Sequence, residues 1–429
     1  MKKNALFLLP IIVMALVLNS CSSDTVVSEN VVSPNNNVEI VENPFAMSAE
    51  DAMADVFDRN LNLRSGFTIE LDDYNVKTTV FNVKHEALSK SKGKEVQQQV
   101  PVYTVSYKDQ QGKAAGFVLT IGDERVANKV LAYSEEGEDF DFSDEGGAFW
   151  EYRFKGYIHN HINNKIATAP RVETRGNMDH GRIYLFFNGD WPQSGDPYNR
   201  FTPYRNNQRV LAGAEAIAMA EIMSSLRWPQ TGVYKRYTTN SATPETVTAS
   251  YVLTDTEYDW LRSSQTGGYA LYPNVMSYIG NLIAECGYRL NTNYQTSGSQ
   301  ANPSDVPAVF SQMGFLTDGY SSYTFSKVET DIATRGLFVF MAGWNPNGGY
   351  HSFIVRGLEY WDVPYLYIVK GNNWNSAWVN EQAFSTTLTN LDLPYEYSNS
   401  CMVVTNIRKN PNNTGCTNAN WRVSSLYTY

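Results

Sequence analysis

The segment from Leu211 to Met223 constrains the fold more than any other part of this chain. It is an alanine-rich run, Leu-Ala-Gly-Ala-Glu-Ala-Ile-Ala-Met-Ala-Glu-Ile-Met, in which strong helix formers follow a glycine. The pattern ends at a proline, Pro229. Apolar residues recur within it at helical spacing: Ala216, Met219, Met223 and Leu226. The sequence therefore predicts a largely apolar helix that begins at position 214.

Length and composition limit the classes of protein that this chain can belong to. Its 429 residues predict two or more domains, and 42% hydrophobic residues suffice for sizeable cores. A net charge of −10, with no cluster of Lys and Arg, excludes a nucleic-acid partner, which would need a basic surface. The spacing of His, Cys, Asp and Glu predicts no metal site, no phosphate loop is present, and no cofactor is expected.

The N-terminus is typical of an exported protein. Lys2 and Lys3 precede the apolar run 5–18, which is too short to span a bilayer well and has the layout of a secretory signal peptide. The residues before Cys21 resemble a bacterial lipobox, which implies lipidation of that cysteine. The alternative is an ordinary signal peptide with a chance cysteine.

We therefore expect a signal peptide over residues 1–20 and a flexible, lipid-anchored tether over 21–43, which is rich in Ser, Val, Asn and Pro. The expected location is the cell envelope, at the outer membrane or the cell surface. Without Cys21, three cysteines remain, which permit at most one disulfide.

Further motifs follow in a fixed order along the second half of the chain. Trp191-Pro-Gln-Ser-Gly-Asp-Pro-Tyr-Asn199 precedes the predicted helix, and Gly349-Tyr-His-Ser-Phe-Ile-Val-Arg-Gly357 and Asn372-Asn-Trp-Asn375 come after it. Together these segments resemble the streptopain family of papain-like cysteine peptidases. In that family a Gly-Cys-Val-Ala-Thr-Ala-Met-Ala-Gln-Ile-Met helix carries the nucleophile, so Ala214 stands where the family has cysteine.

The resemblance implies a role for each matched residue. His351 would be the general base. It lies 137 residues after Ala214, and such imidazoles follow the nucleophile by roughly 130 to 150 residues. Gln193 and the backbone N–H of residue 214 would bind the oxyanion. Asn373 would orient the His351 ring under the cover of Trp374, with Asn372 as the competing candidate.

Each of these residues also has an ordinary structural explanation. A histidine on a Val/Ile strand is often a satisfied core residue, Gln193 can be a turn residue after a proline, and an Asn-Asn pair can form a turn. The family strand Gly-His-Ala-Phe-Val-Ile-Asp-Gly matches Tyr350 to Gly357 but has Asp where this chain has Arg356. The family also has Gln at the position of Glu221, and its glycine-rich run after Trp374 is replaced by the segment 375–378.

Ala115-Gly-Phe-Val-Leu-Thr-Ile-Gly-Asp-Glu-Arg125 and Val130-Leu-Ala-Tyr-Ser134 resemble the propeptide of streptopain-like zymogens, which implies that the first half is a prodomain. A helix is predicted after Ser48, which forms a capping-box-like pattern with Asp51. Strands are predicted at 78–83, 102–107 and 115–121, followed by an apolar stripe at helical spacing: Trp150, Phe154, Tyr157, Ile158 and Ile162. His159 and His161 lie off that stripe, and we expect them to be solvated. A separate binding module is the alternative to a prodomain.

The expected fold is therefore α+β: a prodomain at 44–175 and a two-lobed papain-like domain at 178–429. In the papain-like domain a helical lobe contains position 214, and a β-rich lobe carries His351. Strands are expected at 337–341, 352–355, 365–370 and 402–405. The polar segment 167–179, which contains Arg171 and Arg175, is the expected boundary, either as a processing site or as an uncut linker.

Two functions follow from the alanine at position 214. In the first, which the resemblance implies, the chain would be a secreted, lipid-anchored cysteine peptidase, a hydrolase of peptide bonds made as a zymogen, whose nucleophile has been replaced to stop self-cleavage. Alternatively, it is a natural pseudopeptidase that binds peptides or a protein partner without cleaving them. In either case alanine cannot form an acyl-enzyme, so the chain as written is expected to be inactive.

Overall fold

The computed structural model describes residues 38–58, 74–108, 111–163, 182–257, 272–385 and 401–412. Short gaps inside these ranges fall at 136, 138, 144–145, 186–189, 230, 239–242, 252, 347–348, 361–362 and 371–375. The predicted signal peptide, Cys21 and the predicted boundary at 167–179 lie outside the described residues. Within these ranges no helix is both long and apolar enough to span a membrane.

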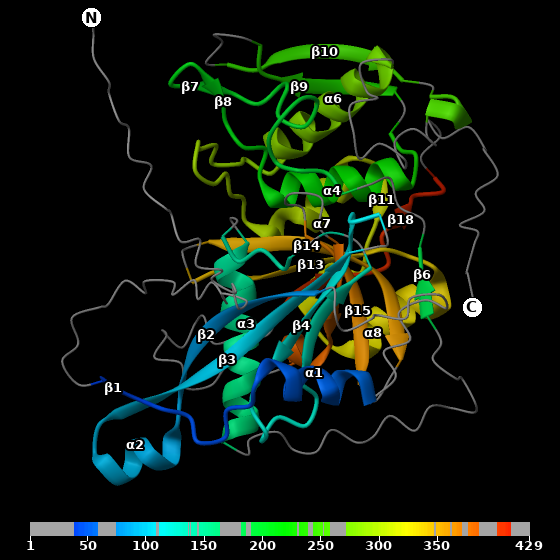
Figure 1. Ribbon diagram of the computed structural model, residues 1–429. Coiled ribbons are helices and arrows are strands. Elements are labelled where there is room, and N and C mark those ends of the chain that lie inside the picture. Colours follow the sequence, from blue (N-terminus) through cyan, green and yellow to red (C-terminus); the bar gives the residue numbers. More distant parts are fainter. Residues whose placement is uncertain are drawn as a thin grey trace, which may run out of the picture.

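The N-terminal half combines long strands with one long helix (Figure 1). Its helices are α1 (Ala49–Asp58), α2 (Glu86–Lys92) and α3 (Gly147–Ile162). Its strands are β1 (Val38–Val41), β2 (Tyr74–Lys84), β3 (Glu95–Lys108), β4 (Ala114–Ile121) and β5 (Val130–Ser134). All three predicted strands and both predicted helices are present, and β2 and β3 are longer than expected. Ser48 Oγ accepts from the Asp51 amide at 3.1 Å, which is the predicted cap of α1.

The C-terminal half separates into the two expected lobes. Its helical lobe contains α4 (Ala214–Ser225), α6 (Pro273–Arg289) and α7 (Val306–Gln312), with β7 (Tyr204–Arg205), β8 (Gln208–Arg209), β9 (Thr231–Arg236) and β10 (Glu245–Ser250). The β-rich lobe contains β6 (Arg182–Tyr184), β11 (Phe315–Leu316), β12 (Tyr320–Ser322), β13 (Val339–Trp344), β14 (Tyr350–Tyr360), β15 (Pro364–Val369), β16 (Ser376–Asn380), β17 (Met402–Val404), β18 (Arg408–Lys409), α8 (Phe325–Glu329) and α9 (Gln382–Ser385). The four strands expected in this lobe correspond to β13, β14, β15 and β17. The α+β fold class is confirmed.

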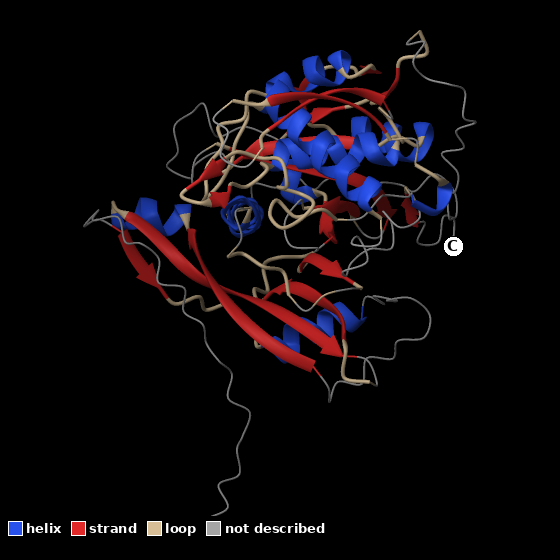
Figure 2. Ribbon diagram, turned by 90° about the horizontal axis from the view of Figure 1, so that it is seen from above, coloured by secondary structure: helices blue, strands red, loops and turns tan. Residues whose placement is uncertain are grey.

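One sheet joins the two halves of the chain. Its strand order is β1-β3-β4-β5-β16-β15-β14-β13-β17-β12, with β2 paired to β3 and β6 paired to β14. The seam lies between β5 and β16, where Trp378 pairs with Tyr133 and Val379 with Ala132 in antiparallel register. Seen from above, the long strands of the N-terminal half form a twisted layer beside the helices of the C-terminal half (Figure 2). The two predicted domains therefore share backbone hydrogen bonds.

Helix α3 is buried around most of its circumference. Trp150, Phe154 and Tyr157 are fully buried, as the apolar stripe predicts. The prediction that His159 and His161 are solvated is wrong. His159 is only 2% exposed and its Nε2 lies 3.6 Å from a carboxylate oxygen of Glu86, while His161 is half-buried against the Tyr157 ring. The helix lies between β2 and the second half of the chain, so both of its faces are covered.

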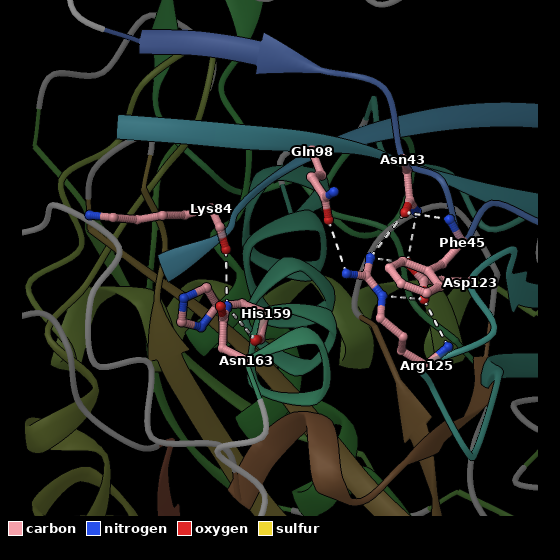
Figure 3. A network of polar contacts seen from close by, with 8 residues as sticks. All are labelled: Asn43, Phe45, Lys84, Gln98, Asp123, Arg125, His159 and Asn163. Atoms are coloured by element: carbon pink, nitrogen blue, oxygen red, sulfur yellow. Dashed lines mark hydrogen bonds and ion pairs between the residues drawn. The ribbon is translucent and has the colours of Figure 1, made fainter. Parts of the chain in front are cut away.

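A network of polar side chains lies near the start of the folded N-terminal half (Figure 3). The buried Asn43 side chain donates to Asp123 at 2.7 Å, and Arg125 pairs with the same carboxylate at 2.6 Å. Arg125 also donates to Gln98 at 3.0 Å. Upstream of Asn43, strand β1 pairs in parallel with β3. The predicted limit of the tether at residue 43 is therefore wrong at its C-terminal end, because residues 38–43 already belong to the folded part.

Arg153 connects α3 to the second half of the chain. Its side chain is buried and donates to the Ala383 carbonyl at 2.8 Å and to the Phe384 carbonyl at 2.6 Å. We expect Arg153→Ala to lower the free energy of unfolding by about 2 to 4 kcal/mol, because it leaves buried carbonyls without donors. Urea denaturation of the full chain measures this. Glu151→Ala, on the same helix, removes only a partly exposed ion pair and should cost less than about 0.5 kcal/mol. Equal effects of the two substitutions on the free energy of unfolding would contradict the conclusion that Arg153 connects α3 to the second half of the chain.

Candidate functional site

Position 214 lies at the N-terminus of α4, as predicted. Gly213 precedes the helix with φ = 90°, a conformation that favours glycine, and a Cβ there would approach the Ser299 carbonyl at 3.1 Å. Ala214 is 3% exposed. A helix N-terminus presents unpaired amides and the positive end of the helix dipole, which is the environment that lowers the pKa of a thiol. The backbone therefore provides the setting that a nucleophilic cysteine requires, whereas the side chain provides no nucleophile.

Gln193 lies beside this helix start. Its Oε1 accepts from the Gly213 amide at 3.1 Å, and its backbone carbonyl accepts from the Ala212 amide at 3.0 Å. The segment that carries Gln193 is held by Glu221 of α4, which accepts from the Trp191 amide at 2.6 Å. The structure thus brings Gln193 next to position 214. Its predicted function in binding an oxyanion stays a prediction.

A polar hollow lies near the segment that precedes α4. It has a volume of about 360 Å³ and is lined by Arg205, Asn206 and the segment 293–297. The Gln295 carbonyl in that segment accepts from the Leu211 amide at 3.3 Å, which fixes the segment against the residues before α4. Among the described residues, no His, Cys, Asp and Glu side chains form a group suited to hold a metal ion.

His351 is the second residue of β14, and its imidazole packs against α3. Its ring centroid lies 5.4 Å from that of Phe149, 6.1 Å from that of Trp150 and 6.0 Å from that of Phe353. Helix α3 begins so close to this ring that a Cβ added to Gly146 would lie 2.6 Å from Nε2. Nε2 has no hydrogen-bond partner within the described part of the chain. The imidazole thus lies in an aromatic cage contributed largely by the N-terminal half.

The imidazole and position 214 are not brought together in this structure. Side chains alternate between the two faces of a strand, and Ser352, the next residue of β14, hydrogen-bonds to α4. His351 and Phe353 instead face α3. Figure 1 shows α4 on one side of β14 and α3 on the other. The predicted contact between His351 and residue 214 is therefore absent from this conformation, because α3 holds the ring on the opposite face of the sheet.

Burial also determines the charge of His351. Desolvation in the aromatic cage lowers the pKa of the imidazole to about 3, and the positive charge of Lys370 acts in the same direction. His351 is consequently neutral at physiological pH in this conformation. A thiolate–imidazolium pair requires the charged ring, so the cage excludes it electrostatically as well as sterically.

The other predicted site residues lie outside the described residues. Asn372, Asn373 and Trp374 fall in the gap at 371–375, so the choice between the two asparagines stays open. Two features of the site were not anticipated from the sequence. One is the contribution of α3 to the surroundings of His351. The other is Glu215. Its charge was the sequence signal that could have indicated it, because a charged residue directly after the nucleophile position interrupts an otherwise apolar run.

Glu215 is buried at the junction of α4, β14 and the segment 299–301. Its Oε1 accepts from Ser352 Oγ at 3.0 Å and its Oε2 accepts from the Ala301 amide at 3.4 Å. Burial raises the pKa of this carboxyl to about 7, because its hydrogen bonds offset only part of the desolvation. The Glu215 charge acts on the phenol of Tyr320. Burial is the main cause that raises the pKa of this phenol, and the nearby Glu215 carboxyl raises it further.

Comparison with known proteins identifies the second half of the chain. Residues 191–375 match the model of the peptidase C10 family. The resemblance to streptopain-like cysteine peptidases is thereby confirmed for this segment, which contains position 214, Gln193 and His351. None of the curated proteins compared with the chain is significantly similar to it.

Two solved structures from Prevotella intermedia are similar to the chain. A fragment of prointerpain A with a cysteine-to-alanine mutation is 17% identical with a TM-score of 0.49, and the match covers 70% of this chain and 94% of that one. Active wild-type interpain A, a cysteine protease, is 18% identical with a TM-score of 0.38, and the match covers 52% of this chain and 94% of that one. The family match therefore supports a C10 cysteine peptidase-like character for the part of the chain that contains residues 191–375.

The raised pKa of Glu215 predicts a specific dependence of stability on pH. The folded protein holds this proton up to about pH 7, whereas the unfolded chain loses it near 4.5, so the stabilisation is complete below 4.5 and is lost as the pH rises to 7. Relative to Glu215→Gln, the parent chain should lose on the order of 3 kcal/mol across this window. Urea denaturation of both proteins between pH 4.5 and 7.5 measures the difference. A difference that does not change with pH would contradict the raised pKa.

Proposed function

We propose that this chain is an exported, lipid-anchored cysteine peptidase zymogen of the C10 family, inactive as written because position 214 is alanine. The main supporting observation is the placement of α4, which sets residue 214 and Gln193 side by side at a helix N-terminus. The substrate would be a peptide or protein, and His351 would be the general base. Lipidation of Cys21 would attach the protein to the outer membrane or the cell surface.

Position 214 suits a thiolate better than any other group. A cysteine there would have the free amides of the first turn of α4 close to its sulfur, and these favour the charged form. The same amides, with Gln193, can stabilise the oxyanion of a tetrahedral intermediate. Alanine leaves this arrangement without the atom that attacks the carbonyl carbon.

Latency would come from α3. Phe149, Trp150 and Gly146 surround the His351 ring on the face away from α4, and the cage keeps the imidazole neutral. Removal of the N-terminal half would expose the ring to water, return its pKa toward the ordinary value and free the start of β14 to turn the ring toward position 214. Cleavage in 167–179 would cut the covalent connection, but the β5–β16 seam and Arg153 would still hold the two halves together.

The second candidate function is a natural pseudopeptidase that binds peptides or a protein partner. It is favoured by departures from the streptopain pattern on α4 and β14. Glu215 and Ser352 replace Val and Ala and are hydrogen-bonded at 3.0 Å. Glu221 and Arg356 replace Gln and Asp. Burial raises the pKa of the Glu221 carboxyl well above its ordinary value, and the Arg356 charge acts in the opposite direction. Paired replacements that contact each other, as Glu215 and Ser352 do, are typical of natural divergence.

Restoring the thiol distinguishes these two functions. Ala214→Cys, after removal of the prodomain, should hydrolyse peptides in a thiol-dependent reaction, whereas the parent chain should show no activity above background. Adding His351→Ala should abolish the regained activity, because the general base is lost. Release of a fluorogenic peptide product is the measurement. A folded, processed Ala214→Cys protein without activity would favour the pseudopeptidase.

The latency model predicts how the full chain responds to proteolysis. Limited proteolysis should produce a fragment that begins between Ala167 and His180, and the nicked halves should stay associated. Gly146→Ala should accelerate their separation several-fold, because its Cβ would collide with the His351 ring. Size-exclusion chromatography after nicking measures this. Glu151→Ala serves as the control on the same helix. Cleavage only elsewhere, or halves that separate at once in the parent, would contradict the model.

A further inference from the structure

The carboxyl of Glu215 connects three segments at the candidate site. Its backbone lies in the first turn of α4, one residue after position 214. One carboxyl oxygen accepts from Ser352 on β14, one residue after His351, and the other accepts from the amide of Ala301. The residues next to Ala301 also reach the other segments. A Cβ on Gly349, which precedes β14, would lie 2.0 Å from Gln300 Oε1, and the Ser299 carbonyl lies next to Gly213.

Burying these polar groups costs free energy unless each of them has a hydrogen-bond partner. Glu215 and Ser352 are 1% and 0% exposed, so neither side chain exchanges its partner for water. A buried polar group that loses its partner costs about 1 to 3 kcal/mol, which strongly favours the one geometry in which both are bonded. The bond therefore resists changes in the separation between the start of α4 and the start of β14.

We propose that Glu215 is a positioning residue, whose carboxyl fixes the backbone of β14 beside His351 at a set distance from the backbone at position 214. The streptopain pattern has Val and Ala at the two positions, so the link is particular to this chain. It rests on the proposed peptidase function. With Ser352 held in this way, the transition from the latent to the working state needs the start of β14, up to His351, to turn away from α3, while Ser352 and the strand after it stay in place.

The inference predicts an effect on catalysis that exceeds any effect on substrate binding. A misplacement of about 1 Å between reacting groups can reduce a rate about a hundredfold. In the Ala214→Cys background, Glu215→Ala should therefore lower kcat about 10- to 100-fold and leave KM within about threefold. Glu215→Gln keeps an oxygen that can accept from Ser352, so it should retain kcat within about threefold. Ser352→Ala should reproduce the loss, and the double substitution should add little to it.

The experiment uses the full-length chain, folded intact, then cleaved in the linker and separated from its N-terminal half, with rates divided by the number of sites titrated by a thiol-directed inhibitor. Glu285→Ala is the matched control, because Glu285 is also a buried carboxylate of the helical lobe, paired with Arg289 on α6 and not in contact with α4 through that pair. It should lower stability without changing kcat per titrated site.

The possible outcomes separate the two proposals. An active Ala214→Cys protein whose kcat is unchanged by Glu215→Ala would overturn the positioning function and leave the peptidase proposal intact. Equal losses of kcat in Glu215→Ala and Glu285→Ala would also overturn it, because they would indicate a general effect of destabilisation. An inactive Ala214→Cys parent would overturn the peptidase proposal and this inference with it. A loss confined to Glu215→Ala and Ser352→Ala, with rescue by Gln, supports the inference.

Discussion

The rest of the structure depends on the antiparallel pairing of β5 with β16. This seam makes one sheet from two halves of the chain that are far apart in sequence. Several hydrogen bonds strengthen it, including one from Ser134 Oγ to the Ser376 carbonyl at 3.0 Å and one from Tyr365 Oη to the Val130 carbonyl at 3.2 Å. Because the sheet is continuous, α3 is fixed against the face of β14 that presents His351.

The position of α3 has an electrostatic consequence for the candidate site. Among the described residues, Phe149, Trp150 and Phe353 surround the imidazole and remove it from water, and Lys370 adds repulsion. The same residue would have an ordinary pKa near water. In this conformation, packing against α3 therefore affects both the direction in which the ring points and the charge that it carries.

The opposite face of β14 has a different chemistry. Ser352 donates a hydrogen bond to Glu215, and the Arg356 charge opposes the rise in the pKa of Glu221 that burial causes. Polar and charged groups of the strand therefore interact with α4 in a region that is otherwise apolar. Buried carboxyls with raised pKa values occur in functional sites and in structural networks alike. Here the hydrogen bonds of Glu215 to Ser352 and Ala301 favour a mechanical role, because they tie together the backbone segments on which the two candidate positions lie.

The sequence by itself determined the elements and their order. Alanine-rich periodicity predicted α4, short runs rich in β-forming residues predicted strands, and the order of the motifs indicated position 214, Gln193 and His351 as site candidates, because these patterns depend on near neighbours in the chain. The sequence could not reveal that His351 faces α3, that His159 is buried or that β1 extends the sheet. Those features depend on which distant surfaces meet, and only the tertiary structure, by closing the β5–β16 seam and burying α3, decided them.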